Sequence, residues 1–205
     1  MLYGGIIKAW VGQDFSEARR SVLAVDLQDV PQIATYVRQL FVEWARLSPE
    51  ESIHNLDLVP EDLHSIVITV ATAGILDVLT PEDVLRLYAD KGLVFANISG
   101  ALAQVFNAWS EEDPAATLQW ITENTEAGSV LREVGLPKAL ENFALADPLR
   151  AFETGLKEPM GDITPYSRGQ EFSVIVSLVN NGRFEHLDSM LPRVRTLRES
   201  THIHS

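Results

Sequence analysis

The chain has 205 residues, of which 46% are hydrophobic, enough to build an ordinary core and to exclude wholesale disorder. Its formal net charge of −13 argues against nucleic acid or an anionic membrane surface as a partner, because both are bound through Lys and Arg. The chain has no cysteine, which excludes disulfides, thiolate nucleophiles and cysteine metal sites.

The N-terminal stretch "MLYGGIIKAWVGQDF" has no basic region and no long apolar run, so it is not typical of a signal peptide. A cytoplasmic location is therefore the default expectation, unless the chain is a fragment of an exported protein. The most apolar segment, residues 66–79, is too short to span a bilayer and carries Asp77. We expect a buried helix there and no membrane insertion, with a strand as the alternative because "IVITVATAG" is rich in β-branched residues.

A helix-capping residue recurs along the chain with a period of about 33 residues, the range of two-helix repeats. Asp, Ser and Thr cap helix N-termini, and Pro, favoured at the first helical position, follows four of these residues. Each capping position therefore predicts the start of a short second helix, here called helix B. The capping positions are Asp14, Ser48, Thr80, Asp113 and Asp147, with a weaker sixth at Gly182.

The helix before each cap, here called helix A, is predicted from apolar runs at residues 33–45, 63–78, 98–110, 129–144 and 170–179. A large apolar residue stands four positions before every cap, where it would close the tight turn between the two helices. These residues are Trp10, Trp44, Leu76, Trp109, Phe143 and Leu178.

Helix B carries an apolar stripe five and eight residues after the cap, interrupted at Arg19 and Gly155. Glu17 and Glu51 lie three residues after their caps and complete capping-box patterns. In "FNAWSEEDPAATLQW" we expect truncation of Trp109 to cost roughly 3–5 kcal/mol and loss of the cap that follows it about 1 kcal/mol.

These patterns predict an all-α fold: about six αα-hairpin repeats stacked into a right-handed superhelix, forming one α-solenoid domain over residues 1–205. The longest Pro/Gly-rich connection, residues 157–169, predicts a bend or a functional loop. Residues 198–205 are expected to fray. Polar segments at the two ends would cap the array, unless the chain belongs to a longer one.

The pattern W-x-x-x-[D/S]-P-x-A-A, with a second indole at Trp120, resembles tandem helical arrays in large bacterial proteins of unknown function, which are similar to TPR and HEAT/armadillo α-solenoids. The likeness is clearest over residues 106–120 and fainter at 42–52 and 142–152. The TPR consensus is not matched, and the acidity argues against RNA-binding pentatricopeptide repeats of similar period. The resemblance implies a helical-repeat fold and a scaffolding role, and it transfers no catalytic residue.

Motifs of catalysis and of nucleotide or metal binding are missing from the sequence, including H-E-x-x-H, G-x-S-x-G, the P-loop and G-x-G-x-x-G. We therefore predict no enzyme, no catalytic residue, no cofactor and no metal. Glu61 and His64, three residues apart, have a spacing that presents two metal ligands on one helix face, but a solvated first turn is the favoured interpretation.

The function predicted from the sequence is a non-catalytic protein- or peptide-binding scaffold that uses the concave face of the array, with a basic partner fitting the acidic charge. The candidate binding residues are aromatic, since large aromatics on a groove make binding hot spots. They are Trp120, Tyr88, Tyr36 and Tyr166. For Trp120, packing on helix A of the next repeat is the alternative. Two other functions stay open: an enzyme with a groove active site near residues 157–169, and a structural spacer in a larger envelope protein.

Overall fold

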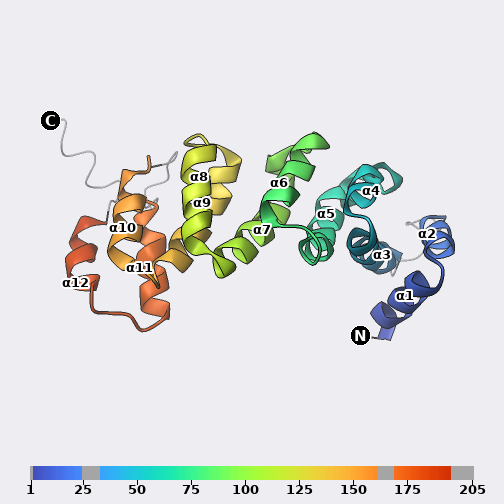
Figure 1. Ribbon diagram of the computed structural model, residues 1–205, viewed down its shortest axis with the longest axis horizontal. Helices are drawn as coiled ribbons and strands as arrows, with labels where there is room; N and C mark the ends of the chain where they lie inside the picture. The colour runs from blue at the N-terminus through green and yellow to red at the C-terminus, as the bar shows by residue number, and fades with distance from the viewer. Residues whose placement is uncertain (1, 25–32, 161–168, 195–205) are drawn as a thin grey trace. The chain divides into compact units, whose positions relative to one another are not determined.

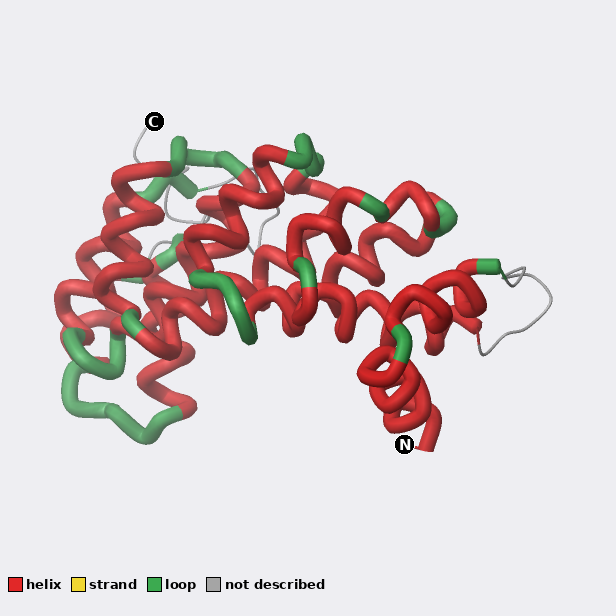
Figure 2. Tube along the Cα trace, turned by 45° about the vertical axis from the view of Figure 1, so that its right-hand side comes forward, coloured by secondary structure: helices red, strands yellow, loops and turns green. Residues whose placement is uncertain are grey.

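The computed structural model describes residues 2–24, 33–160 and 169–194. Within these ranges the chain consists of helices, turns and loops without a strand, which confirms the all-α class (Figure 2). The β-branched segment at residues 66–74 lies inside a helix, as predicted. The chain divides into two compact units, Met1–Val105 and Phe106–Ser205, which are described separately below as unit 1 and unit 2.

In unit 1, helix α2 packs on α1 and α3, and the most extensive helix–helix contact joins α3 to α5 (Figure 1). Short 3₁₀ turns follow α4 and α6 as the chain returns toward the next helix. The elements are α1 (Leu2–Gln13), α2 (Phe15–Leu23), α3 (Ile33–Leu47), α4 (Pro49–His54), η1 (Leu56–Leu58), α5 (Glu61–Leu76), α6 (Pro81–Asp90) and η2 (Phe95–Ile98).

Helix α7 (Ser99–Glu112) runs across the boundary between the two units. In unit 2, α9 contacts α8, α10 and α11, and α10 also packs on α11 (Figure 1). The elements of unit 2 after α7 are α8 (Pro114–Asn124), α9 (Val130–Phe143), α10 (Pro148–Lys157), α11 (Glu171–Asn180), α12 (Leu187–Met190) and η3 (Leu191–Arg193).

Four of the predicted capping residues form the same backbone turn, at Asp14, Ser48, Asp113 and Asp147. Their φ angles lie between −139° and −153° and their ψ angles between 82° and 91°. In each turn the N–H of the capping residue donates to the carbonyl four residues earlier at 2.8–2.9 Å, and its own carbonyl accepts from four residues later at 3.0 Å. The period in the sequence is therefore also a period in local structure at these four positions.

The third turn has a different geometry. Thr80 has φ −67° and ψ 153°, and its hydroxyl caps α6 by accepting the N–H of Asp83. The N–H of Leu79 donates to the Ile75 carbonyl and closes the preceding helix. The residue that is fully buried at this turn is Ile75, whereas the predicted Leu76 is half-buried. The predicted register is wrong by one residue here.

The capping boxes predicted at the first two turns form only in part. Asp14 accepts the backbone N–H of Glu17, as expected for a cap. Ser48 makes no side-chain cap bond, and the carboxylate of Glu51 pairs instead with Arg19 at 3.1 Å. Glu51 therefore connects the two B helices α2 and α4 and does not complete a capping box at the start of α4.

The sixth predicted helix start, at Gly182, is wrong. Gly182 has φ 68° and ends α11, with its N–H bonded to Val179 and the next N–H bonded to Leu178, the pattern of a Schellman C-cap. A glycine in the left-handed region terminates a helix at no steric cost, and α12 begins only at Leu187. Leu187 and Met190 are nevertheless buried, as the apolar stripe predicted.

The B-helix stripe is buried in the other units as well, including Ile53, Leu118 and Phe152. Its two interruptions have structural reasons. The guanidinium of Arg19 lies 5.3 Å from the ring centroid of Trp44, which it covers. At Gly155 a Cβ would meet the backbone of Glu171 at 2.5–2.6 Å, so glycine lets α10 and α11 approach closely.

Polar side chains join positions about one repeat apart along the chain, at separations of 31 to 38 residues. These bonds connect the end of one helix to the corresponding end of a helix in the neighbouring pair, within each unit. They are Arg46 to Asp77 (2.6 Å), Lys91 to the His54 carbonyl (3.1 Å), Asn142 to Ser110 (2.7 Å), Ser177 to the Glu141 carbonyl (2.6 Å) and Arg183 to the Leu145 carbonyl (3.0 Å).

Candidate functional site

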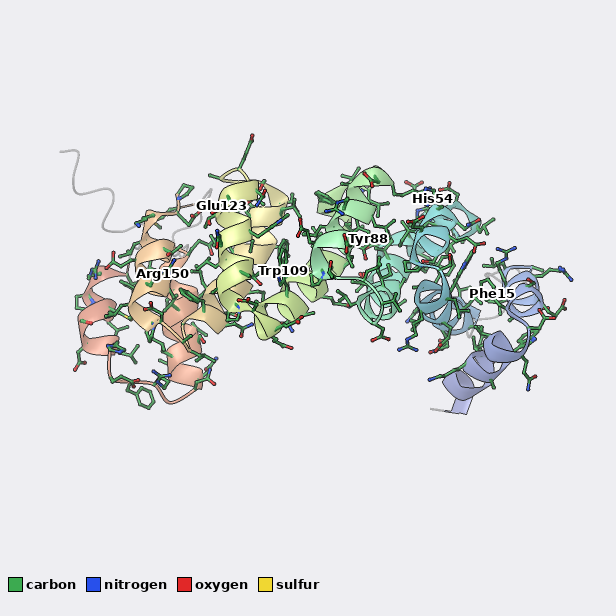
Figure 3. The ribbon with its side chains drawn as sticks, in the orientation of Figure 1. Phe15, His54, Tyr88, Trp109, Glu123 and Arg150 are labelled. Atoms are coloured by element: carbon green, nitrogen blue, oxygen red, sulfur yellow. The ribbon has the colours of Figure 1, made fainter. Side chains whose placement is uncertain are left out.

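The four aromatic residues predicted to bind a partner lie in different surroundings. Tyr36, on α3, is half-buried in unit 1. Tyr88, on α6, is completely buried, so the expectation that it is exposed for binding is wrong (Figure 3). Trp120, on α8 of unit 2, is half-buried, and Tyr166 lies outside the described residues.

Tyr88 is buried because its hydroxyl has a partner inside the core. The hydroxyls of Tyr88 and Thr72 lie 2.6 Å apart, and Thr72 donates its proton to the Ile68 carbonyl at 2.7 Å. Tyr88 must therefore be the donor to Thr72. Burial raises the pKa of Tyr88 to about 12. The chemistry of Tyr88 is that of a core residue.

Trp120 packs against two aromatic rings of the helix before it. Its ring centroid lies 5.3 Å from Trp109 and 6.3 Å from Phe106, both on α7, with tilted planes. Trp109 is itself only half-buried, whereas Trp44 is completely buried. The second indole of the repeated pattern thus covers the first and keeps it from solvent on one side.

The predicted functional loop, residues 157–169, lies between α10 and α11, and its residues 161–168 are outside the described ranges. Its described start is anchored by a buried ion pair in which Arg132 donates two bonds of 2.7 Å to Glu158. Arg132 also donates to the carbonyls of Ile121 and Thr125. The hydrogen bond with Glu158 raises the pKa of Arg132. Through its bonds to Glu158, Ile121 and Thr125, Arg132 joins the start of α9 to the ends of α8 and α10.

Glu61 and His64 line an open hollow of about 490 Å³ in unit 1, together with residues that follow α6. The Nε2 of His64 lies 2.7 Å from the Val59 carbonyl and must carry a proton to bond there. Within residues 2–24, 33–160 and 169–194, no group of three or more histidines or carboxylates is placed to hold a metal ion.

The groove with the clearest ligand-binding chemistry lies in unit 2, along one face of α8. The α8 side consists of residues spaced three and four apart, and the end of α9 and the first turns of α10 complete the lining. Its volume is about 430 Å³, and its lining residues are Ala115, Leu118, Gln119, Thr122, Glu123, Phe143, Arg150 and Thr154.

Arg150 holds the main positive charge of this groove. Its guanidinium lies 5.5 Å from the ring centroid of Phe143, a cation–π arrangement that orients the side chain. Its backbone N–H completes the cap of α10 by donating to Asp147 at 3.1 Å. None of the ion pairs formed among the described residues includes the Arg150 guanidinium.

The other polar groups of the groove use their protons within their own helices. The hydroxyl of Thr122 donates to the Leu118 and Gln119 carbonyls, and that of Thr154 donates to the Arg150 carbonyl. The amide of Gln119 donates to Glu123 at 3.0 Å. What the two threonine side chains offer to a ligand is therefore oxygen lone pairs, while Arg150 supplies N–H donors.

The sequence interpretation did not single out these groove residues. A partial signal was present, since Gln119, Thr122 and Glu123 lie at helical spacing beside the buried stripe and are polar. The free guanidinium had no signal, because Asp147 and Glu153 stand three residues to either side of Arg150 and both suggest an ion pair.

No helix in the described parts of the chain is long and apolar enough to cross a lipid bilayer. Comparison of the chain with protein-family models, with curated proteins and with solved structures gave no match.

Proposed function

We propose that the protein is a non-catalytic helical-repeat scaffold that binds a segment of another protein, and that the groove between α8 and α10 is its binding site. The helix pairs would belong to a single array, stacked as a right-handed superhelix. The recurring cap turns and the bonds between neighbouring pairs support this repeat organisation.

The observation that carries the proposal is the combination of free donors and free acceptors along one open groove. Arg150 offers guanidinium N–H groups without a competing carboxylate, and Thr122 and Thr154 offer hydroxyl oxygens. A peptide main chain, which alternates N–H and C=O groups, satisfies both kinds of group. A structural spacer has no need of such a groove, and for this reason we favour binding over a purely structural role.

A groove-filling substitution tests the proposal. Ala115 is exposed on the groove face of α8, so Ala115→Trp should fill the groove without disturbing the core. Ala89 is exposed on α6 of unit 1 and is not among the residues that line the groove, so Ala89→Trp is the matched control. The purified full chain and both variants are used to select binders from a phage-displayed random peptide library.

The wild type and Ala89→Trp should enrich the same group of peptide sequences, and Ala115→Trp should fail to retain them. Circular dichroism of each variant checks that the helix content is unchanged. Enrichment no greater than on an uncoated surface, or equal retention of the same peptides by Ala115→Trp, would show that the groove is not a peptide site.

A further inference from the structure

The net charge of −13 suggests a basic partner, but the groove itself contains an arginine that lacks a carboxylate. We propose that the groove recognises an extended segment of a partner protein that places an Asp or Glu side chain on Arg150. This inference rests on the function proposed above, and it names the chemical class of the ligand.

The first argument is that the other arginines in the described ranges, apart from Arg38 and Arg150, each pair with a carboxylate. The chain has 29 acidic residues and 16 basic ones, so carboxylates are in excess. Under these conditions an arginine at the surface normally finds an acidic neighbour. The paired arginines are Arg19, Arg20, Arg46, Arg86, Arg132, Arg183 and Arg193.

The second argument is that the carboxylates of the groove lining, of α10 and of its N-cap each have another partner. Asp147 accepts the backbone N–H of Arg150 and caps α10. Glu153 pairs with Arg193 at 2.7 Å. Glu123, across the groove on α8, accepts from Gln119. The guanidinium is therefore oriented by Phe143 and left available to a carboxylate from outside.

The third argument concerns the kind of carboxylate. Capture of a free C-terminus uses a nest of backbone N–H groups, and such nests form around residues in the left-handed region. Among the described residues, those with positive φ are Gly92, Gly128 and Gly182, and none of them lines the groove. An open groove with acceptors on both walls instead fits a strand that passes through and donates its main-chain N–H groups to Thr122 and Thr154.

The test uses the peptides selected on the full chain in the phage experiment, resynthesised with acetylated and amidated ends. We expect them to share an Asp or Glu, and replacing it by the corresponding amide should weaken binding about 10- to 100-fold in fluorescence polarisation. Arg150→Gln should weaken the acidic peptide to the same degree and should leave the amide peptide unchanged. Arg86→Gln, which removes an exposed positive charge on α6, is the matched control and should bind like the wild type.

Three outcomes would overturn the inference while leaving the groove as a binding site. These are selected peptides rich in Lys or Arg, binding that depends on a free C-terminal carboxylate, and equal affinity of Arg150→Gln for the acidic peptide. In each of these cases Ala115→Trp still abolishes binding. If Ala115→Trp has no effect, the proposed function itself fails, so the two failures are distinguishable.

Discussion

The packing of α3 on α5 in unit 1 depends on a single glycine, and replacing it is a direct test of the structure. A Cβ at Gly74 would overlap the Val42 carbonyl oxygen and would lie 3.3 Å from both the Ala45 Cβ and the Arg46 Cγ. Because the carbonyl belongs to the backbone of α3, rotation of a side chain cannot relieve the overlap. In Gly74→Ala the two helices must move apart.

The expected cost follows from two opposing terms. Overpacking a core costs about 1–3 kcal/mol, and an overlap with backbone belongs at the upper end of that range. Alanine is more favourable than glycine by about 1 kcal/mol in a helix interior. Gly74→Ala should therefore lower the free energy of unfolding by about 2 kcal/mol.

Gly12 provides the matched control, because it is also inside a helix of unit 1 and a Cβ there would meet nothing within 4 Å. Gly12→Ala should raise the free energy of unfolding by up to about 1 kcal/mol through helix propensity alone. Urea unfolding of the full chain, followed by far-UV circular dichroism, compares the three proteins. The midpoint should move to lower urea for Gly74→Ala and to higher urea for Gly12→Ala. A midpoint for Gly74→Ala at or above that of the wild type would refute the close approach of α3 and α5.

Four further substitutions probe other parts of the chain. Since the pKa of Tyr88 is raised from 10.0 to about 12, its contribution to the free energy of unfolding should be complete below pH 10 and should fall by about 2–3 kcal/mol as pH rises to 12. Tyr88→Phe should remove that pH dependence in equilibrium unfolding. Glu158→Gln should cost about 3 kcal/mol, because it leaves the buried guanidinium of Arg132 without its carboxylate. Trp109→Ala should cost about 3 kcal/mol and Asp113→Ala about 1 kcal/mol, measured by thermal unfolding.

Each of these changes has a result that contradicts its reasoning. If the wild type and Tyr88→Phe lose stability in parallel above pH 10, the tyrosine is not the titrating group. Glu17→Gln breaks an exposed ion pair and should cost less than about 1 kcal/mol, so an equal loss for Glu158→Gln would contradict the buried network. A milder effect for Trp109→Ala than for Asp113→Ala would mean that the indole does not hold the two helices together.

The starts of the first five B helices were predictable from sequence because a cap is a local interaction. Asp14, Asp113 and Asp147 bond to an N–H only three residues away, so their role depends on a short stretch of chain. Gly182 shows the limit of the same reasoning. Glycine occurs both before and after helices. The repeat spacing predicted the start of a helix at Gly182, whereas the positive φ of this residue ends α11.

The candidate site was less predictable, because it depends on which of several possible partners each side chain takes. The sequence suggested that Trp120 is exposed. In the structure Trp120 packs on the ring of the half-buried Trp109, in the same helix pair. Arg150 has acidic neighbours in sequence on both sides. In the folded chain Glu153 pairs with Arg193, and Asp147 caps α10. Competition of this kind is decided by tertiary structure.

The net charge and the groove favour opposite partners, and the contradiction disappears when distance is considered. The charge of −13 acts over the whole protein and is screened beyond a Debye length of about 10 Å at 0.1 M salt. A carboxylate that binds Arg150 would lie at hydrogen-bond distance from the guanidinium, well inside that length, where the local attraction outweighs the repulsion by the net charge. The net charge of the protein therefore repels an acidic segment as it approaches, and Arg150 binds it once the two are in contact. Its association rate should increase with added salt, whereas a basic partner attracted by the net charge would associate more slowly.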